Sequence, residues 1–356
     1  MSGRIDVGVL AATGTVGQRL VQLLDGHPWF RLAEVGASSE SVGRRFGEVL
    51  DADPQPVGAG FANAVLDLTL KDSLDEWASP VLLSALPSQV AGSLEAELAG
   101  RGHLVVSNAA SHRMEADVPL VIPEVNPDHL RLLELQRERW PGGLVTNPNC
   151  SVVGLAVALA PLHRTFGVRA VTVTTLQALS GAGRPGPAGA EILDNVLPYI
   201  PDEEEKLGQE PQKILGELGE RAVRFADFPV SAQTHRVPVA HGHLLAVSAK
   251  LGRAATSEEV TVALASFRSA VLEECLPSAP QRVLELLEDQ TRPQPRLDRD
   301  RGGGMTVSVG RVRRCEVADV KFLVLVHNLV RGAAGAALLN AELCHVRGAT
   351  RRAGAR

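Results

Sequence analysis

Short apolar runs alternate with amphipathic segments over roughly the first third of the chain. Four runs have the length and composition of buried strands: residues 5–11, 32–37, 81–85 and 104–107. Apolar residues at helical spacing occupy two of the intervals, residues 16–24 and 89–98. Strands that alternate with helices in this way form a parallel, doubly wound sheet, so the pattern predicts an α/β domain at the N-terminus.

The pattern changes from about Val168 onward. Long stretches rich in β-branched residues predict strands, namely VRAVTVTTLQAL, HLLAVSAKL and MTVSVGRVR. A capping box at residues 256–259 predicts the start of a helix between them. The segment 291–304 is rich in Pro, Arg and Asp and predicts a loop. Small residues at 333–343 predict a helix that packs closely on another element, and we expect it to return to the first domain.

The composition is that of an ordinary globular protein. The 356 residues are enough for two domains, and 45% of them are hydrophobic while 22% are charged. The net charge of −5 and the aromatic content of 3% give no reason to expect nucleic acid or an anionic membrane as a partner. The charged N-terminus predicts no signal peptide, and the longest uncharged stretch, 144–162, is too polar for a membrane span.

Cysteine and histidine spacing predicts neither a disulfide framework nor a metal site. The cysteines lie far apart and form no CxxC motif: Cys150, Cys275, Cys315 and Cys344. Three histidines cluster between residues 235 and 243, but their spacing is poor for zinc and no cysteine or acidic pair stands beside them. We therefore expect a reduced, cytoplasmic enzyme without a metal.

The turn after the first predicted strand carries the glycine pattern of a dinucleotide-binding site. Residues 11–17, AATGTVG, resemble the G-x-x-G-x-x-G form of this turn, with Ala11 in place of the first glycine. Gly14 would let the backbone approach a pyrophosphate, and Gly17 would let the helix pack on the strand. We expect the cofactor to contact five residues of this turn: Thr13, Gly14, Thr15, Val16 and Gly17.

The end of the second predicted strand favours NADP over NAD. No acidic residue stands at the strand end, where an NAD enzyme would bind the ribose 2′-hydroxyl. Hydroxyls and cations suited to a 2′-phosphate follow instead: Ser38, Ser39, Ser41, Arg44 and Arg45. The alternative explanation for these residues is a solvated polar turn.

A cysteine stands at the predicted start of a buried helix. The sequence Asn147-Pro148-Asn149-Cys150 directly precedes the apolar run SVVGLAVALAPL. Because unpaired N–H groups and the helix dipole favour an anion at a helix N-terminus, we expect the thiol pKa to be lowered. Such a cysteine can attack a carbonyl or acyl group, and the same N–H groups could hold the resulting oxyanion. The alternative is a small buried residue that only fills space.

The segment HRVPVAHGH, residues 235–243, could complete such a site. Arg236 could bind a carboxylate through two hydrogen bonds, and His243 could shuttle a proton for a cysteine mechanism. The arginine stands seven residues before the histidine, and the short strand and glycine turn between them could bring both groups to one pocket mouth.

An ordered series of motifs along essentially the whole chain resembles the aspartate-β-semialdehyde dehydrogenase family, in the branch found in archaea, fungi and some bacteria. The motifs are VVSNAASHRM, VPLVIPEVN, TNPNCSVV, LQALSGAGRPG, ILDNVLPYIPDEEEK, HRVPVAHGH and VHNLVRGAAG. The resemblance implies a Rossmann-type NADP-binding domain over residues 1–145 and a catalytic and dimerisation domain over 146–330. A C-terminal helix within 331–356 would pack on the first domain.

The resemblance also implies roles for individual residues. The catalytic residues would be the nucleophile Cys150, the acid/base His243 and Gln177, which orients the acyl intermediate. The substrate's α-carboxylate, α-ammonium and phosphate would be bound by Arg236, by Glu210, and by Arg113 with Lys213. Further implied contacts are Asn149 beside the nucleophile and, toward the cofactor, Ser180, Gly181 and Asn328.

The implied reaction is the NADPH-dependent reduction of 4-aspartyl phosphate to aspartate 4-semialdehyde and phosphate through a cysteine thioester. This reaction belongs to the biosynthesis of lysine, threonine and methionine, and the implied assembly is a homodimer or homotetramer. N-acetyl-γ-glutamyl-phosphate reductase runs the same chemistry, but its substrate lacks a free ammonium, so the pair Glu210 and Arg236 argues against it. Glyceraldehyde-3-phosphate dehydrogenase would need a different sequence around the cysteine. A catalytically inactive paralogue that serves as a binding subunit is a third alternative.

Overall fold

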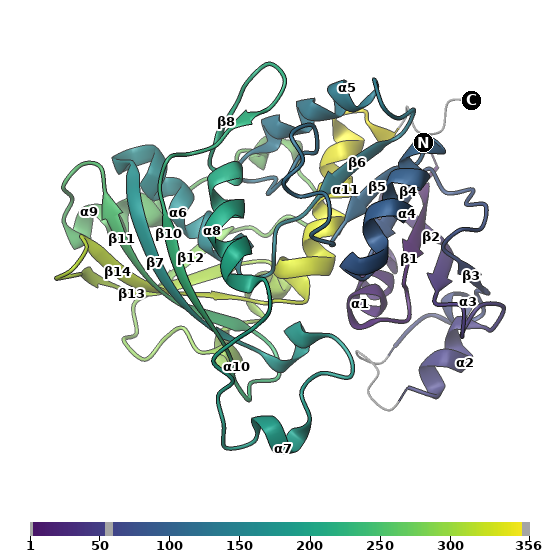
Figure 1. Ribbon diagram of the computed structural model, residues 1–356, viewed down its shortest axis with the longest axis horizontal. Helices are drawn as coiled ribbons and strands as arrows, with labels where there is room; N and C mark the ends of the chain where they lie inside the picture. The colour runs from purple at the N-terminus through teal and green to yellow at the C-terminus, as the bar shows by residue number, and fades with distance from the viewer. Residues whose placement is uncertain (1–2, 54–59, 351–356) are drawn as a thin grey trace.

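The computed structural model describes residues 3–53 and 60–350, so the last six residues of the predicted C-terminal part lie outside the described residues. Two α/β halves lie side by side, and the chain passes from the first to the second and back (Figure 1). Each half is built on one six-stranded sheet. Among the described helices, none combines the length and the apolar character that crossing a membrane requires.

The first sheet is entirely parallel, with the strand order β3-β2-β1-β4-β5-β6. The strands are β1 (Ile5–Leu10), β2 (Phe30–Ala37), β3 (Leu70–Asp72), β4 (Val81–Ser84), β5 (Leu104–Ser107) and β6 (Gly143–Thr146). This order is that of the dinucleotide-binding fold, and the chain reverses direction across the sheet between β1 and β4. The predicted fold class is confirmed, although hydrophobic pattern alone did not identify the short strands β3 and β6.

Helices cover both faces of this sheet. They are α1 (Thr15–Leu24), α2 (Phe46–Asp51), α3 (Asn63–Leu66), α4 (Ser88–Gly100), the 3₁₀ helix η1 (Pro127–Arg131) and α5 (Leu132–Gln136). Apolar side chains on α1 pack against β1 and β2, where Leu20, Val21 and Leu24 are almost completely buried. The helical spacing of these residues is the pattern that predicted the helix.

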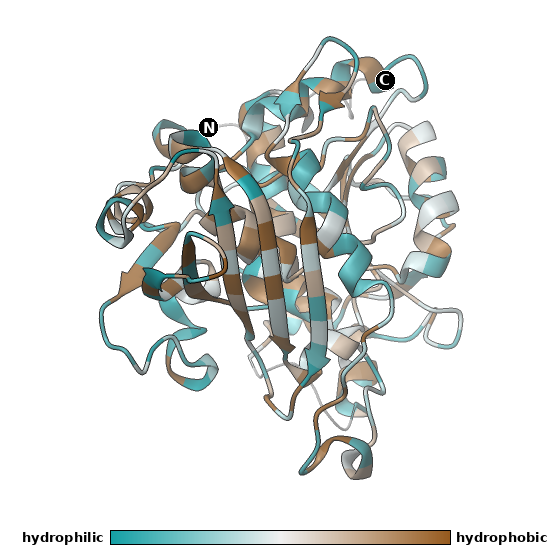
Figure 2. Cartoon of the chain, turned by 60° about the vertical axis from the view of Figure 1, so that its left-hand side comes forward, coloured by the Kyte–Doolittle hydropathy of each residue, from teal (hydrophilic) through white to brown (hydrophobic). Residues whose placement is uncertain are grey.

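The second sheet is mixed, with the order β10-β7-β11-β14-β13-β12. Its strands are β7 (Val168–Gln177), β10 (Val230–Arg236), β11 (His243–Leu251), β12 (Leu284–Leu287), β13 (Val307–Arg314) and β14 (Val320–Val326). The helices α6 (Val152–Phe166) and α9 (Ser257–Ala265) cover one face, and alternate residues of β7 and β11 are buried against them. Figure 2 shows the other face with no helix over it.

Irregular segments and short helices complete the second half. They include η2 (Leu179–Ala182), α7 (Gly189–Ile192), α8 (Glu203–Ile214), the hairpin of β8 (Glu217–Leu218) and β9 (Val223–Arg224), and η3 (Leu272–Glu274). The segment 291–304, predicted as a loop, contains two short helical turns, α10 (Pro295–Asp298) and η4 (Arg301–Gly304). Pro295 at the first helical position supplies the fixed φ that starts a helix, so proline acts here as a start rather than a break.

The C-terminal segment returns to the first half. A π-helical turn (Val330–Ala334) leads into α11 (Gly335–Val346), whose small residues join the core of the first sheet. Because side chains such as Ala334 and Ala337 are short, this helix lies close to α1 and to β4 and β5. The yellow helix in Figure 1 lies against the blue strands for this reason.

One buried ion pair anchors this return. The guanidinium of Arg331 donates two hydrogen bonds, of 2.7 and 2.9 Å, to the carboxylate of Glu124. Both side chains are inaccessible to solvent, at 1% and 0% exposure. Since removing one partner leaves an uncompensated buried charge, the pair holds the π-helical turn against the segment that follows β5.

Arg331→Met should lower the free energy of unfolding by about 3–5 kcal/mol, because it leaves Glu124 charged and unpaired in the interior. Glu124→Gln with Arg331→Met should recover part of this loss, since no buried charge then remains. Chemical denaturation of the three proteins measures the difference. If the double variant is no more stable than Arg331→Met, a buried unpaired charge is not the cause.

Candidate active site

The candidate site lies at the carboxyl edge of the first sheet, where it meets the second half. The turn after β1 and the segment Asn147–Cys150 after β6 both follow carboxyl ends of parallel strands, and these ends share one edge. Ligands of doubly wound sheets bind at this edge. α6, which follows Cys150, belongs to the core of the second half, so the cysteine stands at the junction of the two halves.

The turn after β1 fits a dinucleotide pyrophosphate. Ala11 adopts a φ of 55°, the left-handed conformation for which the family pattern uses glycine. Gly14 is exposed at the N-cap of α1, and no side chain caps this helix start. A Cβ on Gly17 would lie 2.1 Å from the carbonyl oxygen of Ala11, so only glycine allows the helix to pack this close. The first-turn N–H groups near Thr13, Thr15 and Val16 are therefore available to an anion.

Polar groups follow the end of β2 at Ala37, as the NADP prediction requires. Ser38 and Ser39 are exposed, and Ser41 is half-buried. Arg44 is exposed and makes one long contact, of 3.4 Å, to the carbonyl oxygen of Glu48. The neighbouring arginine, at position 45, is paired instead with Asp67. Within the described ranges 3–53 and 60–350, Arg44 has no carboxylate partner, so its guanidinium can meet a 2′-phosphate.

Cys150 stands just before the first turn of α6, which begins at Val152. Asn149 caps this helix: its Oδ1 accepts hydrogen bonds from the backbone N–H groups of Ser151 and Val152, at 2.8 and 3.3 Å. The side-chain oxygen of Asn149 therefore occupies N–H groups at the helix start that were expected to bind an oxyanion. Asn149 shapes the turn that carries the nucleophile.

Glycines let two backbone segments touch the reactive groups directly. A Cβ on Gly332 would lie 2.7 Å from the Cβ of Cys150, so the π-helical turn of the C-terminal segment lies on the nucleophile. A Cβ on Gly181 would lie within about 3 Å of both His243 and Arg236. These two side chains, from the ends of β11 and β10, are therefore neighbours under the Ser180–Gly181 loop.

Hydrogen bonds hold that loop over the site. Asn328 donates from Nδ2 to the Ser180 hydroxyl at 2.9 Å, and its Oδ1 accepts from the N–H of Gly242 at 2.9 Å. Arg236 donates to the carbonyl oxygen of Ala178 at 2.9 Å. His241, another imidazole of the segment 235–243, stacks on His327 with ring centroids 5.8 Å apart.

The tautomer of His243 follows from its backbone contact. The N–H of Ala178 donates to Nδ1 of His243 at 3.0 Å, so Nδ1 carries no proton and the neutral ring is protonated at Nε2. Burial lowers the pKa of His243 to about 3, and the charges of Arg236 and His327 add to the decrease. Nε2 has no hydrogen-bond partner among the described residues. This ring is therefore a neutral donor that a ligand can use.

The carboxylate of Glu203, which was not predicted from the sequence, connects the groups around Cys150. Glu203 accepts from Nδ2 of Asn149 at 2.8 and 3.0 Å and from Nε2 of Gln177 at 3.0 Å. The amide of Gln177 also donates to Thr175, so its carbonyl oxygen is the atom left for a ligand. Glu203 lies in a run of three glutamates, and its spacing of seven residues from Glu210 along one helix face is the only signal in the sequence.

Two residues with implied substrate roles are occupied within the protein. Glu210, 2% exposed, accepts from Arg113 at 2.8 Å through one oxygen and from the N–H of Asn149 at 2.7 Å through the other. Lys213, 1% exposed, donates to three backbone carbonyls of the segment 113–118, at 2.7, 2.7 and 2.8 Å. An ammonium has three donors, so none is left for phosphate. Glu210 and Lys213, for which the resemblance implies direct substrate contacts, therefore bind protein groups in this structure.

Arg113 keeps donors for an anion even though it is buried. Its two terminal nitrogens bind Glu210 and the carbonyl oxygen of Asn108, and its Nε has no partner among the described residues.

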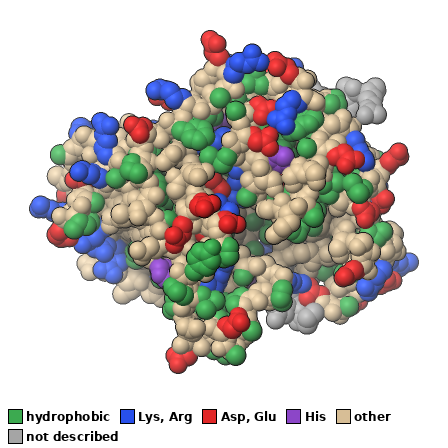
Figure 3. Space-filling view, in the orientation of Figure 1, with side chains coloured by type: hydrophobic (Ala, Val, Ile, Leu, Met, Phe, Trp, Pro, Cys, Tyr) green, Lys and Arg blue, Asp and Glu red, His purple; other side chains and the backbone are tan. Residues whose placement is uncertain are grey.

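Figure 3 shows acidic and basic side chains gathered over α8, between the two halves.

The expected lowering of the thiol pKa is wrong for this structure. Burial raises the pKa of Cys150 to about 12, and the negative charge of Glu203 adds to the rise. Three cations act in the opposite direction, in the order Arg236, Arg113 and Lys206. The helix N-terminus does not offset the effect of burial on the thiol pKa, because Asn149 occupies the first N–H groups of the helix and the carboxylate of Glu203 lies nearby.

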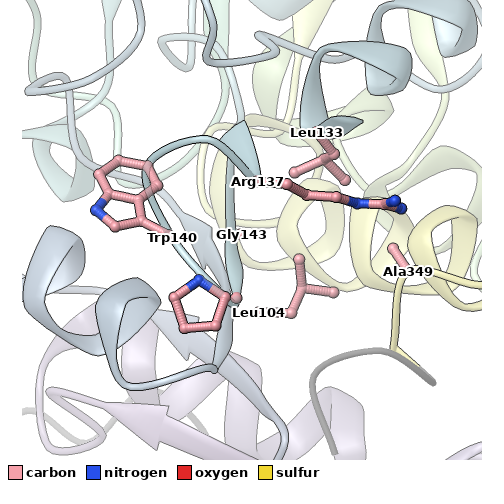
Figure 4. A pocket seen from close by; sticks show the side chains of 8 residues that line it. Leu104, Leu133, Arg137, Trp140, Gly143 and Ala349 are labelled. Atoms are coloured by element: carbon pink, nitrogen blue, oxygen red, sulfur yellow. The ribbon is translucent and has the colours of Figure 1, made fainter. Parts of the chain in front are cut away.

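A separate cavity lies at the opposite edge of the first sheet. It has a volume of about 360 Å³ and is lined by the first residues of β5 and β6, Leu104 and Gly143, together with Leu133, Arg137 and Trp140 (Figure 4). Because Cys150 follows the carboxyl end of β6, this cavity is not part of the candidate site.

Comparisons with known proteins find similar proteins over nearly the whole chain. The family described as "Semialdehyde dehydrogenase, NAD binding domain" matches residues 6–133, and "Semialdehyde dehydrogenase, dimerisation domain" matches residues 159–331. The chain is 45% identical to the aspartate-semialdehyde dehydrogenase of Archaeoglobus fulgidus, over 96% of this chain and 98% of that protein. It is 40% identical to that of Schizosaccharomyces pombe, with the same coverage of both chains. The crystal structure of the Candida albicans aspartate-semialdehyde dehydrogenase with NADP superposes with a TM-score of 0.89 at 38% identity, covering 98% of this chain and 100% of that one.

The rate at which Cys150 is alkylated in the free protein should depend on pH as expected for a thiol with a raised pKa. Because only the thiolate reacts, the rate should rise about tenfold per pH unit from about pH 7 to about pH 10. Peptide-resolved mass spectrometry after iodoacetamide treatment distinguishes Cys150, which is partly exposed, from the exposed Cys275. A rate that is already constant near neutral pH would mean that the free thiol is ionised, contrary to this electrostatic argument.

Proposed function

This chain belongs to the aspartate-semialdehyde dehydrogenase family, and we propose that it carries out the family's reaction on the groups that surround Cys150. The reaction is the NADPH-dependent reduction of 4-aspartyl phosphate to aspartate 4-semialdehyde and phosphate. The observation that carries the proposal is the set of charges around one thiol: three cations and one carboxylate act on Cys150. The substrate has complementary charges, namely a carboxylate, an ammonium and a phosphate.

Substrate recognition divides among these charges. Arg236, beside His243, binds the α-carboxylate with two parallel hydrogen bonds. Glu203 supplies the negative charge for the α-ammonium, helped by the carbonyl oxygen of Gln177. Glu210 instead neutralises and orients Arg113, which binds the phosphate. A free α-ammonium is therefore required, and this requirement argues against an N-acetylated substrate.

The chemistry proceeds through a thioester on Cys150. The sulfur attacks the acyl carbon, the bond from that carbon to the phosphate oxygen breaks, and the thiol proton leaves on the phosphate. NADPH, when bound, supplies the hydride that reduces the thioester. The resulting alkoxide on Cys150 collapses, which breaks the C–S bond, releases the aldehyde and leaves a thiolate that takes one proton from solvent. The positive charges of Arg236 and Arg113 favour the thiolate in each direction.

His243 acts through the proton on Nε2. Because Nδ1 accepts from the N–H of Ala178, the neutral ring offers a donor and no acceptor at Nε2. We assign it to the oxygen that becomes negative when the thioester is attacked by hydride, where a fixed neutral donor stabilises developing charge. The general-base role is thereby replaced by hydrogen-bond donation.

The cofactor is NADP, bound at the carboxyl edge of the first sheet. The exposed Gly14 and the uncapped first turn of α1 receive the pyrophosphate, and Arg44 with the serines after β2 receives the 2′-phosphate. The Ser180–Gly181 loop, which lies against His243 and Arg236 and is bound by Asn328, borders the nicotinamide end.

The protein assembles as a homodimer through the uncovered face of the second sheet. This face carries Thr172, Thr174 and Leu176 of β7 and Leu244 and Ala246 of β11. These small or apolar side chains form a flat surface, and Leu176 is 38% exposed. The second half is also the part of the chain that matches a dimerisation domain. A monomeric mass in sedimentation velocity at micromolar concentration would contradict this assembly.

The decisive assay is the reverse reaction, with aspartate semialdehyde, phosphate and NADP. Wild type should reduce NADP only when phosphate is present, and it should reject the N-acetylated aldehyde. Arg236→Lys should lower kcat/KM for the aldehyde, because lysine cannot make two parallel hydrogen bonds to the carboxylate. The loss should correspond to a rise of about 2–4 kcal/mol in activation free energy. The KM for NADP should hardly change. Equal use of both aldehydes by wild type would refute the assigned substrate.

Arg44→Ala should shift cofactor preference. The variant should have a KM for NADP raised about tenfold or more and an unchanged KM for NAD, because only NADP carries the 2′-phosphate. The neighbouring arginine provides a matched control: Arg45→Ala removes a cation that is paired with Asp67, and the ratio of the two KM values should stay near that of wild type. If both variants change the ratio of the KM values for NADP and NAD equally, Arg44 does not bind the 2′-phosphate.

A further inference from the structure

An ion pair between the two halves lies beside the turn that follows β1. Arg184, in the irregular segment after η2 in the second half, donates to the carboxylate of Asp53, which follows α2 in the first half. The side chain of Asp53 is only 9% exposed, whereas that of Arg184 is 34% exposed. A nearly buried carboxylate of the nucleotide-binding half is therefore paired with a cation that belongs to the other half.

One side-chain amide connects this carboxylate to the glycine turn. Gln18 on α1 is completely buried, and its Nε2 donates to the carbonyl oxygen of Thr13 at 2.8 Å and to Oδ2 of Asp53 at 3.0 Å. Arg184 donates to the same oxygen of Asp53. Because a single nitrogen separates the carboxylate from the turn, the two lie well within the screening length of about 8 Å at physiological ionic strength.

The charge of Asp53 opposes the binding of an anion at this turn. A dinucleotide pyrophosphate is doubly negative, and the first-turn N–H groups and the dipole of α1 attract it. A carboxylate at short range and largely removed from water repels the same group, because screening is weak there. The first half by itself therefore carries a charge that weakens its own cofactor site.

We propose that Arg184 is a positioning residue for the cofactor: it neutralises Asp53 and thereby allows the turn of the first half to hold the pyrophosphate. This inference rests on the proposed cofactor site. Arg184 acts through Asp53 and Gln18, and it is not a ligand of the cofactor. The second half thus supplies the counter-charge that the nucleotide-binding half needs.

The segment that carries Arg184 is fixed to the second half just before it crosses to the first. The backbone N–H of Ser180 donates to the carbonyl oxygen of Ala240 at 3.2 Å, and the Ser180 hydroxyl accepts from Asn328 at 2.9 Å. Gly183 has a φ of 70°, which lets the chain turn directly before Arg184. The loop over the reactive groups therefore continues into the residue that pairs with Asp53.

A double-mutant cycle tests the proposal. Arg184→Met should raise the KM for NADP about tenfold or more, because it leaves Asp53 charged beside the pyrophosphate. Asp53→Asn should stay within about threefold of wild type, since an amide oxygen still accepts from Gln18 and carries no charge. The variant with both substitutions should return to the level of Asp53→Asn. A loss that persists in the double variant would mean that Arg184 contacts the cofactor itself, which would overturn its action through Asp53.

The two cofactors separate this role from recognition of the 2′-phosphate. Because NAD and NADP share the pyrophosphate, Arg184→Met should raise both KM values by a similar factor, whereas Arg44→Ala should raise that for NADP alone. Arg184→Lys, which keeps the charge, should stay within about threefold of wild type for both cofactors. An effect of Arg184→Met on NADP alone would contradict the proposal.

A matched control comes from a second arginine–aspartate pair of the first half. Arg31 pairs with Asp6 at 2.6 Å, at the amino ends of β2 and β1 and thus at the edge of the sheet opposite the turn. Arg31→Met should leave the KM values for NADP, NAD and aspartate semialdehyde within about twofold of wild type. Arg184→Met should likewise leave the KM for aspartate semialdehyde within about twofold.

Equilibrium binding separates cofactor affinity from turnover. Titration of each protein with NADPH, followed by the fluorescence of the nicotinamide, should give a Kd about tenfold or more higher for Arg184→Met than for wild type. The double variant should bind as Asp53→Asn does. An unchanged Kd in Arg184→Met would overturn the role of Arg184. If wild type itself binds no NADPH, the proposed cofactor site fails instead, so the two failures are distinguishable.

Discussion

The requirement that buried charges be paired determines how the reactive groups are held. At the junction of the two halves, α8 places Glu203 and Glu210 under the segment that carries Cys150. Both buried carboxylates need hydrogen-bond donors there, and the donors come from Asn149, Gln177 and Arg113. The hydrogen bonds that stabilise the buried carboxylates therefore also fix the orientation of the groups around the thiol.

The return of the C-terminal segment closes the site from the other side. The buried pair of Arg331 and Glu124 holds the π-helical turn, and Gly332 lies directly on Cys150. α11 then packs into the core of the first sheet. The segment that covers Cys150 therefore continues directly into the core of the nucleotide-binding half.

The electrostatics of the free site keep both reactive groups neutral. Burial raises the pKa of the Cys150 thiol and lowers that of the His243 imidazole, so a thiolate–imidazolium pair is disfavoured before ligands bind. The tautomer of His243, set by the backbone of Ala178, makes its free nitrogen a donor. Because the thiolate is the nucleophilic form, the free protein holds Cys150 mainly as the less reactive thiol.

The sequence by itself determined the parallel sheet and the glycine turn at residues 11–17, and it predicted Cys150, Arg236 and His243 as site residues, because each rests on local periodicity or on an ordered motif. It also supported a returning C-terminal helix, since small residues permit close packing. Only the tertiary structure decided the environment of each charge. Whether Glu210 and Lys213 face a ligand or the protein depends on which segment packs over α8, and no local pattern records that. The thiol pKa was mispredicted for the same reason, because the helix start acts locally whereas burial and the charge of Glu203 come from parts of the chain far away in sequence.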